Sequence, residues 1–166
     1  TGDFNVGNGD PGAISSATGN LNVLGNANVN GNLTVVGGTV VGAGSTLSGD
    51  GSITTGAPAG VIVNGGNLAP SDGANPSNLF GTGTLDIVSD LTLQSKSTWT
   101  VDLASGGISD RVAVTGSITL TDVDLVGGSL GVSPADSTTP GNLAAGTPYW
   151  IGSNDGADAI TGIFGN

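Results

Sequence analysis

A six-residue repeat constrains the fold of this chain more than any other feature of its sequence. Glycines at positions 19, 25, 31 and 37 open three near-copies of one unit, GNLNVL, GNANVN and GNLTVV. The apolar residues that continue this period are Val23, Val29, Val35, Val41, Leu47 and Ile53. Within each unit, apolar residues alternate with Asn or Thr, which is the two-residue period of a half-buried strand. Each unit therefore predicts a strand of about four residues followed by a Gly-Asn corner.

Strands this short favour a parallel β-helix, because the chain shows no regularly spaced two-residue hairpin loops. Three units would make one triangular coil of about 18 residues, and successive coils would stack as parallel strands. Residues 19–36 would form one coil and residues 37–54 the next. This register predicts Val23 beneath Val41, Val29 beneath Leu47, and Val35 beneath Ile53. The asparagines at 20, 26 and 32 are expected to be corner residues that hydrogen-bond to nearby backbone rather than to a ligand.

The repeat continues more loosely after residue 54. Residues 56–80 contain three prolines and predict a coil with a protruding loop. The six-residue step returns at Ile87, Leu93 and Trp99, and then at Val114, Leu120 and Val126. We therefore divide the chain into a lead (1–18), solenoid coils (19–133), and a loop followed by a terminal coil or cap (134–166).

Composition indicates an all-β chain and excludes several kinds of partner. All 13 acidic residues are aspartate, which disfavours helices, and the only basic residues are Lys96 and Arg111. The net charge of −11 excludes nucleic acid and an anionic membrane surface, since two cations cannot neutralise a row of phosphates. No apolar run approaches the roughly 20 residues that a membrane span needs. Thr1 in place of Met indicates that the sequence begins after processing or inside a longer chain.

Several later stretches carry a family resemblance. They are GGTVVGAGSTLSGDGSI, VNGGNLAPSDGANP, GTLDIVSDLTLQSKSTWTVDL, SDRVAVTGSITL and YWIGSNDGADAITGIFGN, in this order. From about residue 37 onward, the chain thus resembles the Gly-rich β-helical repeat regions (autotransporter-associated β-strand repeats) of bacterial autotransporter-type surface proteins. The resemblance implies an exported, right-handed parallel β-helix that serves as a stalk, adhesin or surface layer and carries no catalytic residues. The hexads at 19–54 also resemble left-handed hexapeptide β-helices and bacterial cytoskeletal β-helix polymers, so a left-handed helix remains an alternative.

Few residues suggest catalysis. The chain contains no His, Cys or Glu, which removes the common catalytic bases and thiol nucleophiles. Asp122 and Asp124 are two residues apart and would project from one strand face, as the paired carboxylates of a glycan-cleaving enzyme must. A solvent-facing strand or turn is the simpler explanation for both. Asp110 and Arg111 are expected to form a local ion pair, and a ligand contact is the alternative.

Calcium is the one cofactor that the sequence suggests. Asn154, Asp155 and Asp158 in SNDGAD, and Asp72 in PSDGANP, carry the hard oxygen ligands that calcium prefers. Neither stretch is an EF-hand loop or a calcium-binding β-roll repeat. Plain Asx turns are the alternative interpretation of both.

The predicted function is that of a non-catalytic structural protein at the cell surface. A solenoid has two open ends with unpaired backbone groups, and head-to-tail stacking of copies would satisfy both and build a filament. The aromatic residues predicted to anchor this junction are Phe4, Tyr149, Trp150 and Phe164. The alternative is a glycan-binding or glycan-cleaving β-helix, which would need an aromatic platform along one face. Trp99 is the only aromatic residue in the middle of the chain, and its place in the apolar period predicts a core position.

Overall fold

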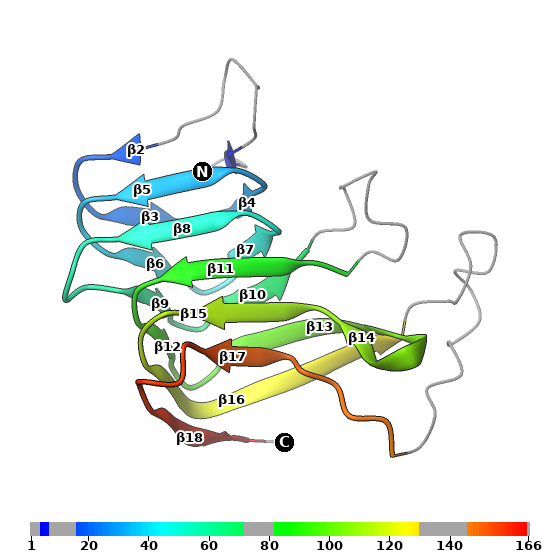
Figure 1. Cartoon of the computed structure of the whole chain (residues 1–166). Helices are drawn as coiled ribbons and strands as arrows, with labels where there is room; N and C mark the ends of the chain where they lie inside the picture. The colour runs from blue at the N-terminus through cyan, green and yellow to red at the C-terminus, as the bar shows by residue number, and fades with distance from the viewer. Residues whose placement is uncertain (1–3, 7–15, 72–81, 130–145, 166) are drawn as a thin grey trace.

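The computed structural model describes residues 4–6, 16–71, 82–129 and 146–165, and these residues form three columns of short parallel strands (Figure 1). The β3 column contains β3 (Leu21–Val23), β6 (Thr39–Val41), β9 (Val61–Val63), β12 (Leu91–Leu93), the first half of β16 (Ile118–Ser129) and β18 (Ile160–Phe164). The β4 column contains β1 (Phe4–Val6), β4 (Asn26–Val29), β7 (Thr46–Gly49), β10 (Asn67–Pro70), β13 (Thr98–Ala104) and the second half of β16. The β5 column contains β2 (Ser16–Ala17), β5 (Asn32–Val35), β8 (Ser52–Thr55), β11 (Thr84–Val88), β15 (Arg111–Val114) and β17 (Gly152–Asn154).

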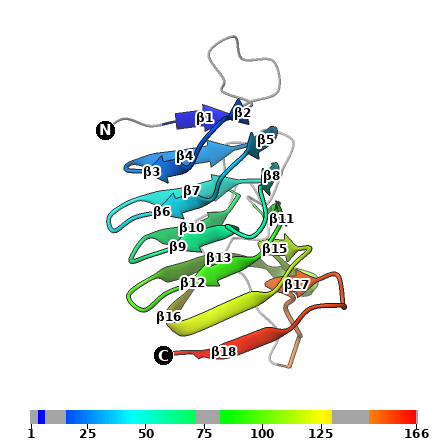
Figure 2. The same cartoon turned by 90° about the vertical axis from the view of Figure 1, so that its left-hand side faces the viewer.

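The chain passes through the three columns in turn, which is the arrangement of a parallel β-helix. Figure 2 shows the coils stacked from β1 at one end to β18 at the other. A short 3₁₀ turn at Ser105–Gly107 is the only helix among the described residues, and β14 (Ile108–Ser109) after it is the one strand that pairs antiparallel, with β13. The all-β, parallel-strand prediction is therefore confirmed.

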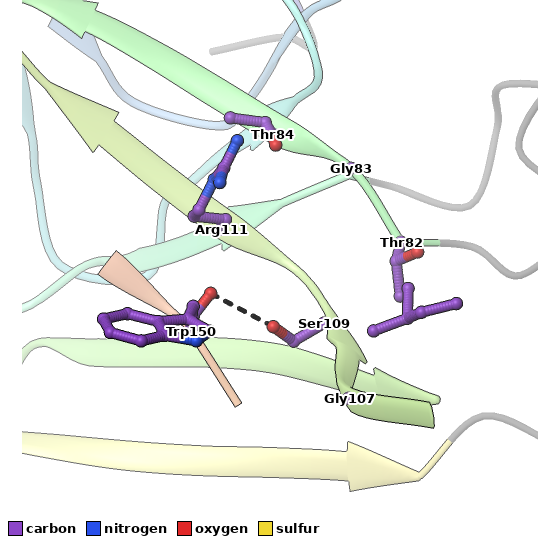
Figure 3. A pocket seen from close by; sticks show the side chains of 8 residues that line it. Thr82, Gly83, Thr84, Gly107, Ser109, Arg111 and Trp150 are labelled. Atoms are coloured by element: carbon purple, nitrogen blue, oxygen red, sulfur yellow. Dashed lines mark hydrogen bonds between the residues drawn. The ribbon is translucent and has the colours of Figure 1, made fainter. Parts of the chain in front are cut away.

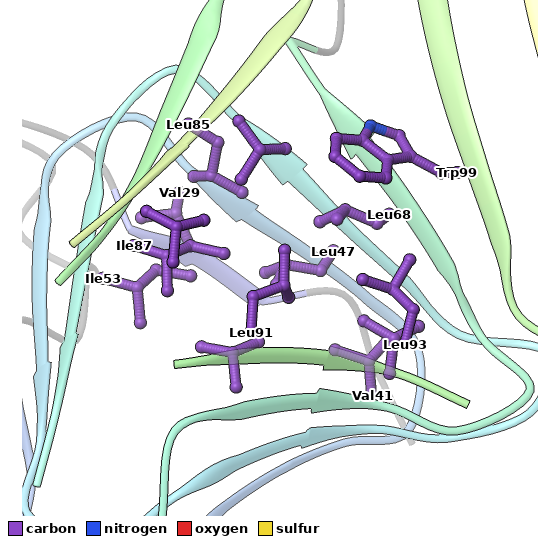
Figure 4. Packing of buried hydrophobic residues seen from close by; sticks show 14 of the residues in the cluster. Val29, Val41, Leu47, Ile53, Leu68, Leu85, Ile87, Leu91, Leu93 and Trp99 are labelled. Atoms are coloured by element: carbon purple, nitrogen blue, oxygen red, sulfur yellow. The ribbon is translucent and has the colours of Figure 1, made fainter. Parts of the chain in front are cut away.

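Apolar side chains from all three columns fill the interior between them (Figure 4). The short strands β4, β5, β9 and β12 alternate buried and less buried residues, as the hexads predict. Residues in register build columns of side chains along the stack, for example Val23, Val41, Val63, Leu93 and Leu120. Trp99 is 2 % exposed, which confirms its predicted place in the core.

Two of the three predicted stacking contacts are wrong by two residues. Val23 does pair with Val41, but Leu47 lies on Ala27 and Ile53 lies on Leu33. The corner between β3 and β4 contains residues 24–25, whereas the corner between β6 and β7 contains residues 42–45. Two extra residues in this corner shift the following strands by two, so inward-facing residues still meet inward-facing residues.

The number of residues between paired positions also varies from coil to coil. Leu21 pairs with Thr39, 18 residues further on, but Val61 pairs with Leu91, 30 residues further on. The added residues lie between the strands and leave the columns continuous.

Val126 is predicted to face the core, but it is 46 % exposed. A register shift between Thr121 and Val123 places Asp122 in a bulge with a φ of 51°, where β16 passes from the β3 column to the β4 column. The bulge changes which residues point inward, so Val123 is buried and Leu125 packs against the core instead of Val126.

Polar corner residues hold one coil to the next. The Asn20 side-chain oxygen accepts a hydrogen bond from the backbone N–H of Gly38 at 3.1 Å, and the Asp90 carboxylate accepts one from Ser117 at 2.8 Å. Asn20 therefore has the structural corner role that its sequence position predicts, although its partner lies on the adjacent coil.

Two adjacent coils approach each other closely at Gly49. Its φ is 117°, and a Cβ atom there would lie 2.1 Å from the Val29 carbonyl oxygen. Gly44 has a similar left-handed φ of 73°, but a Cβ atom there would have no neighbour within 4 Å. We expect Gly44→Ala to cost about 1–2 kcal/mol from backbone strain alone.

For Gly49→Ala we expect a loss of more than about 3 kcal/mol, because strain and a backbone clash add. Urea unfolding of both variants measures the difference. Equal losses would contradict the close inter-coil contact at Gly49.

Candidate functional site

A groove on the outer side of the β5 column is the candidate site. It has a volume of about 390 Å³ and is lined by Thr82, Gly83, Thr84, Gly107, Ile108, Ser109, Arg111 and Trp150. These residues come from the start of β11, the β14 turn, the start of β15, and the segment that leads into β17 (Figure 3). Three successive coils therefore contribute to one surface.

Trp150 has the largest side chain among the residues that line the groove. It is 71 % exposed, and its backbone carbonyl accepts a hydrogen bond from the Ser109 hydroxyl at 3.1 Å. This bond fixes the Trp150 backbone to the β14 turn while the indole faces solvent. Arg111 and Trp150 both line the groove, and Figure 3 shows the Arg111 side chain directed toward Thr84 and away from the Trp150 indole.

Asp110 is a buried residue whose hydrogen bonds stabilise the wall of the groove at Gly83. The residue is 3 % exposed, and its carboxylate accepts hydrogen bonds from the backbone N–H groups of Gly83 at 2.8 Å and Asp102 at 2.9 Å. These bonds join the start of β11 to β13 at the point where β15 begins. The predicted ion pair with Arg111 is wrong, because both Asp110 oxygens bind backbone groups and no ion pair joins the two residues in the described structure.

Burial raises the pKa of Asp110 from 3.8 to about 7, although its backbone hydrogen bonds act in the opposite direction and the nearby Asp102 carboxylate adds to the rise. Burial likewise raises the pKa of Asp102. A buried acid with this pKa gains charge within the neutral pH range, so the groove wall is held by a group that titrates there.

Three of the predicted calcium ligands, Asn154, Asp155 and Asp158, lie at the end of β17 and in the turn that follows it. The Asn154 side-chain oxygen accepts the Gly156 N–H at 3.2 Å, and the Asp155 carboxylate accepts the Ala157 N–H at 3.0 Å. The Asn154 amide also donates to the Asp158 carbonyl oxygen. These are the bonds of Asx turns, the alternative given above.

No group of three or more acidic, His or Cys side chains gathers for a metal within the parts of the chain that the structure describes. Asp72 lies outside those parts. Calcium binding stays a prediction.

The four aromatic residues predicted as junction anchors occupy different places. Phe164 packs on Trp99, with ring centroids 6.0 Å apart, at the end of the core. Trp150 lies in the groove, and Tyr149 beside it is half-buried. Phe4 contributes its backbone to β1, and its side chain lies outside the described part. Their shared role at a junction stays a prediction.

Asp122 and Asp124 are both exposed but do not project from one regular strand face. Asp122 lies in the bulge at the corner, whereas Asp124 follows it on the β4 column opposite Thr98. The exposed positions fit the simpler explanation given above, a solvent-facing strand or turn, since the strand turns between the two carboxylates.

Comparisons with known proteins find no match for this chain. No protein family model matches it, and neither the curated proteins nor the solved structures give a match. Among the described residues, no helix is long and apolar enough to cross a membrane. The function must therefore be argued from the residues themselves.

The raised pKa of Asp110 predicts a pH-dependent stability. Between about pH 4 and 7 the folded chain holds a proton that the unfolded chain has lost, so the free energy of unfolding falls as pH rises. One such proton corresponds to a slope of at most about 1.4 kcal/mol per pH unit. We expect Asp110→Asn to remove this component from urea unfolding measured at several pH values.

Asp86→Asn is the matched control, because it removes the same charge from an exposed position. The measured quantity is the change of the unfolding free energy with pH, not its value at one pH. Asp110→Asn also turns the side-chain NH₂ group toward one of the two backbone N–H groups, which removes a hydrogen bond at every pH. Identical slopes for the wild type and Asp110→Asn would contradict the prediction.

Proposed function

We propose that this chain is a non-catalytic structural segment of an extracellular, cell-surface protein. It is a right-handed β-solenoid that builds a stalk, fibre or filament by head-to-tail stacking of its own copies. The observation that carries this proposal is the pair of open edges at the two ends of the strand columns.

Both ends of the stack carry strands with one unpaired edge. In the described residues, β3 pairs only with β6, and β18 pairs only with β16. Such edges present a row of backbone N–H and C=O groups to any strand that can pair with them. Because the strands of the column are parallel, β3 of a second copy can follow β18 with the pairing used throughout the stack.

The side chains at these edges are apolar and uncharged. Ile160 and Ile163 of β18 are 55 % and 73 % exposed, and Leu24, directly after β3, is 68 % exposed. Ile160 continues the register column of Leu91 and Ile118, so a copy stacked on β18 would bury it. Burying one such side chain contributes about 1.5–3 kcal/mol. Neither strand carries the charged residues that usually protect an edge from pairing.

The composition supports the non-catalytic part of the proposal. Without His, Cys or Glu the chain lacks the usual catalytic bases and nucleophiles, and Asp122 and Asp124 do not form a carboxylate pair. The resemblance to autotransporter repeat regions supports the surface location.

The stacking contact predicts that Ile163→Lys prevents assembly. A lysine at this exposed position leaves the core unchanged, but it places a charge on the strand edge that a second copy would have to pair with. Sedimentation velocity over a range of protein concentrations, together with negative-stain electron microscopy, measures assembly. We expect rods that lengthen with concentration in the wild type and single particles in Ile163→Lys.

Val88→Lys is the matched control, since Val88 is 41 % exposed in the middle of the stack. We expect it to assemble like the wild type. Single particles of wild-type protein at every concentration would overturn the filament, and assembly of Ile163→Lys would overturn the β18 junction.

A further inference from the structure

We propose that the groove containing Trp150 and Arg111 binds an oligosaccharide that carries a carboxylate, of the uronic or sialic acid type. This binding site is additional to the structural role, and it lies on the side of the stack rather than at its ends.

The indole of Trp150 supplies a platform for a sugar ring. It is exposed over 71 % of its surface, and Ile108 in the same groove is 45 % exposed. The face of an aromatic ring is negatively polarised and attracts the C–H groups on the flat side of a pyranose. The Ser109 hydrogen bond holds the Trp150 backbone in place, so little ordering is required when a sugar binds.

The guanidinium of Arg111 supplies the group that selects an acid. Arg111 is exposed, and no ion pair engages it among the described residues. Its neighbour Asp110 is turned away toward Gly83 and Asp102. The planar guanidinium can therefore donate two hydrogen bonds to a carboxylate of the ligand.

The remaining lining of the groove suits the hydroxyl groups of sugars. Thr82 and Thr84 offer side-chain hydroxyls that both donate and accept hydrogen bonds, whereas the Ser109 hydroxyl, which donates to Trp150, can accept one. The volume of about 390 Å³ lies within the range of about 300–1,000 Å³ found for small-ligand sites.

The charge of the whole chain limits the kind of acid. A net charge of −11 repels a dense polyanion, so long runs of acidic sugars or phosphates are disfavoured. A short ligand with few carboxylates gains the Arg111 contact without a large repulsive field. These observations favour an acidic oligosaccharide over nucleic acid or a sulfated polymer.

Isothermal titration calorimetry with four probes tests the proposal. Trigalacturonic acid and its methyl ester share one sugar chain, and the ester replaces each carboxylate by a neutral methyl ester; 3′-sialyllactose and lactose differ only in the acidic sugar. We expect the wild type to bind at least one acid about tenfold or more tightly than its neutral partner, which is about 1.4 kcal/mol. No binding of either acid, or equal binding of acid and neutral partner, would overturn the proposal.

Two variants with matched controls locate the site. Arg111→Gln should remove the preference for the acid, whereas Lys96→Gln removes the same charge elsewhere and should keep it. Trp150→Ala should weaken binding at least tenfold, whereas Leu24→Ala removes a side chain that is similarly exposed, at 68 %, and should not.

The assembly assay keeps this proposal separate from the structural one. We expect Trp150→Ala and Arg111→Gln to assemble like the wild type. Loss of assembly in Trp150→Ala with unchanged sugar binding would assign Trp150 to the junction between copies and overturn the binding site.

Discussion

Parallel pairing of each coil with the next is the interaction on which this molecule depends. A strand of three or four residues buries too little surface to be stable alone, so its backbone groups and its inward side chains both rely on the neighbouring coil. Each inward position is fixed by the position below it, whereas the corners only have to connect the strands. Added residues therefore gather outside the columns, as in the four-residue corner at 42–45 and the 3₁₀ turn at Ser105–Gly107. The candidate groove is built from such additions, since its lining includes Gly107, Ile108 and Ser109.

The sequence predicted the regular parts of the fold for a physical reason. The alternation of apolar and polar residues around Val23, Leu33 and Leu47 indicates which of them are buried, because successive side chains of a strand point to opposite faces. The register between coils depends on corner length, and the sequence does not show how many residues a corner uses. The prediction therefore failed at the contact of Val29 with Leu47, and at Val126 after the Asp122 bulge.

The candidate site was harder to predict than the core. Asp110 has the local sequence of an ordinary charged residue before a strand, and its burial results from Gly83 and Asp102 in other parts of the chain. Trp150 was expected at a junction because it lies close to Phe164 in sequence, yet Phe164 packs on Trp99 while Trp150 lies over the side of two earlier coils. Position around the stack, which decides between these roles, depends on the lengths of all preceding corners.

The division between ends and sides gives the molecule two independent surfaces. At the ends, the proposed pairing between copies would use backbone groups, so it would depend on strand direction and tolerate many apolar side chains, such as those of Ile160 and Ile163. On the sides, backbone groups are already paired within the stack, and only side chains such as Trp150 and Arg111 are available to a ligand. Because every coil adds side surface without changing the ends, a stack of copies would repeat the groove along its length. Weak binding at one groove would then become strong binding by the assembly through multivalency, which would link the proposed structural role to the proposed recognition role in one molecule.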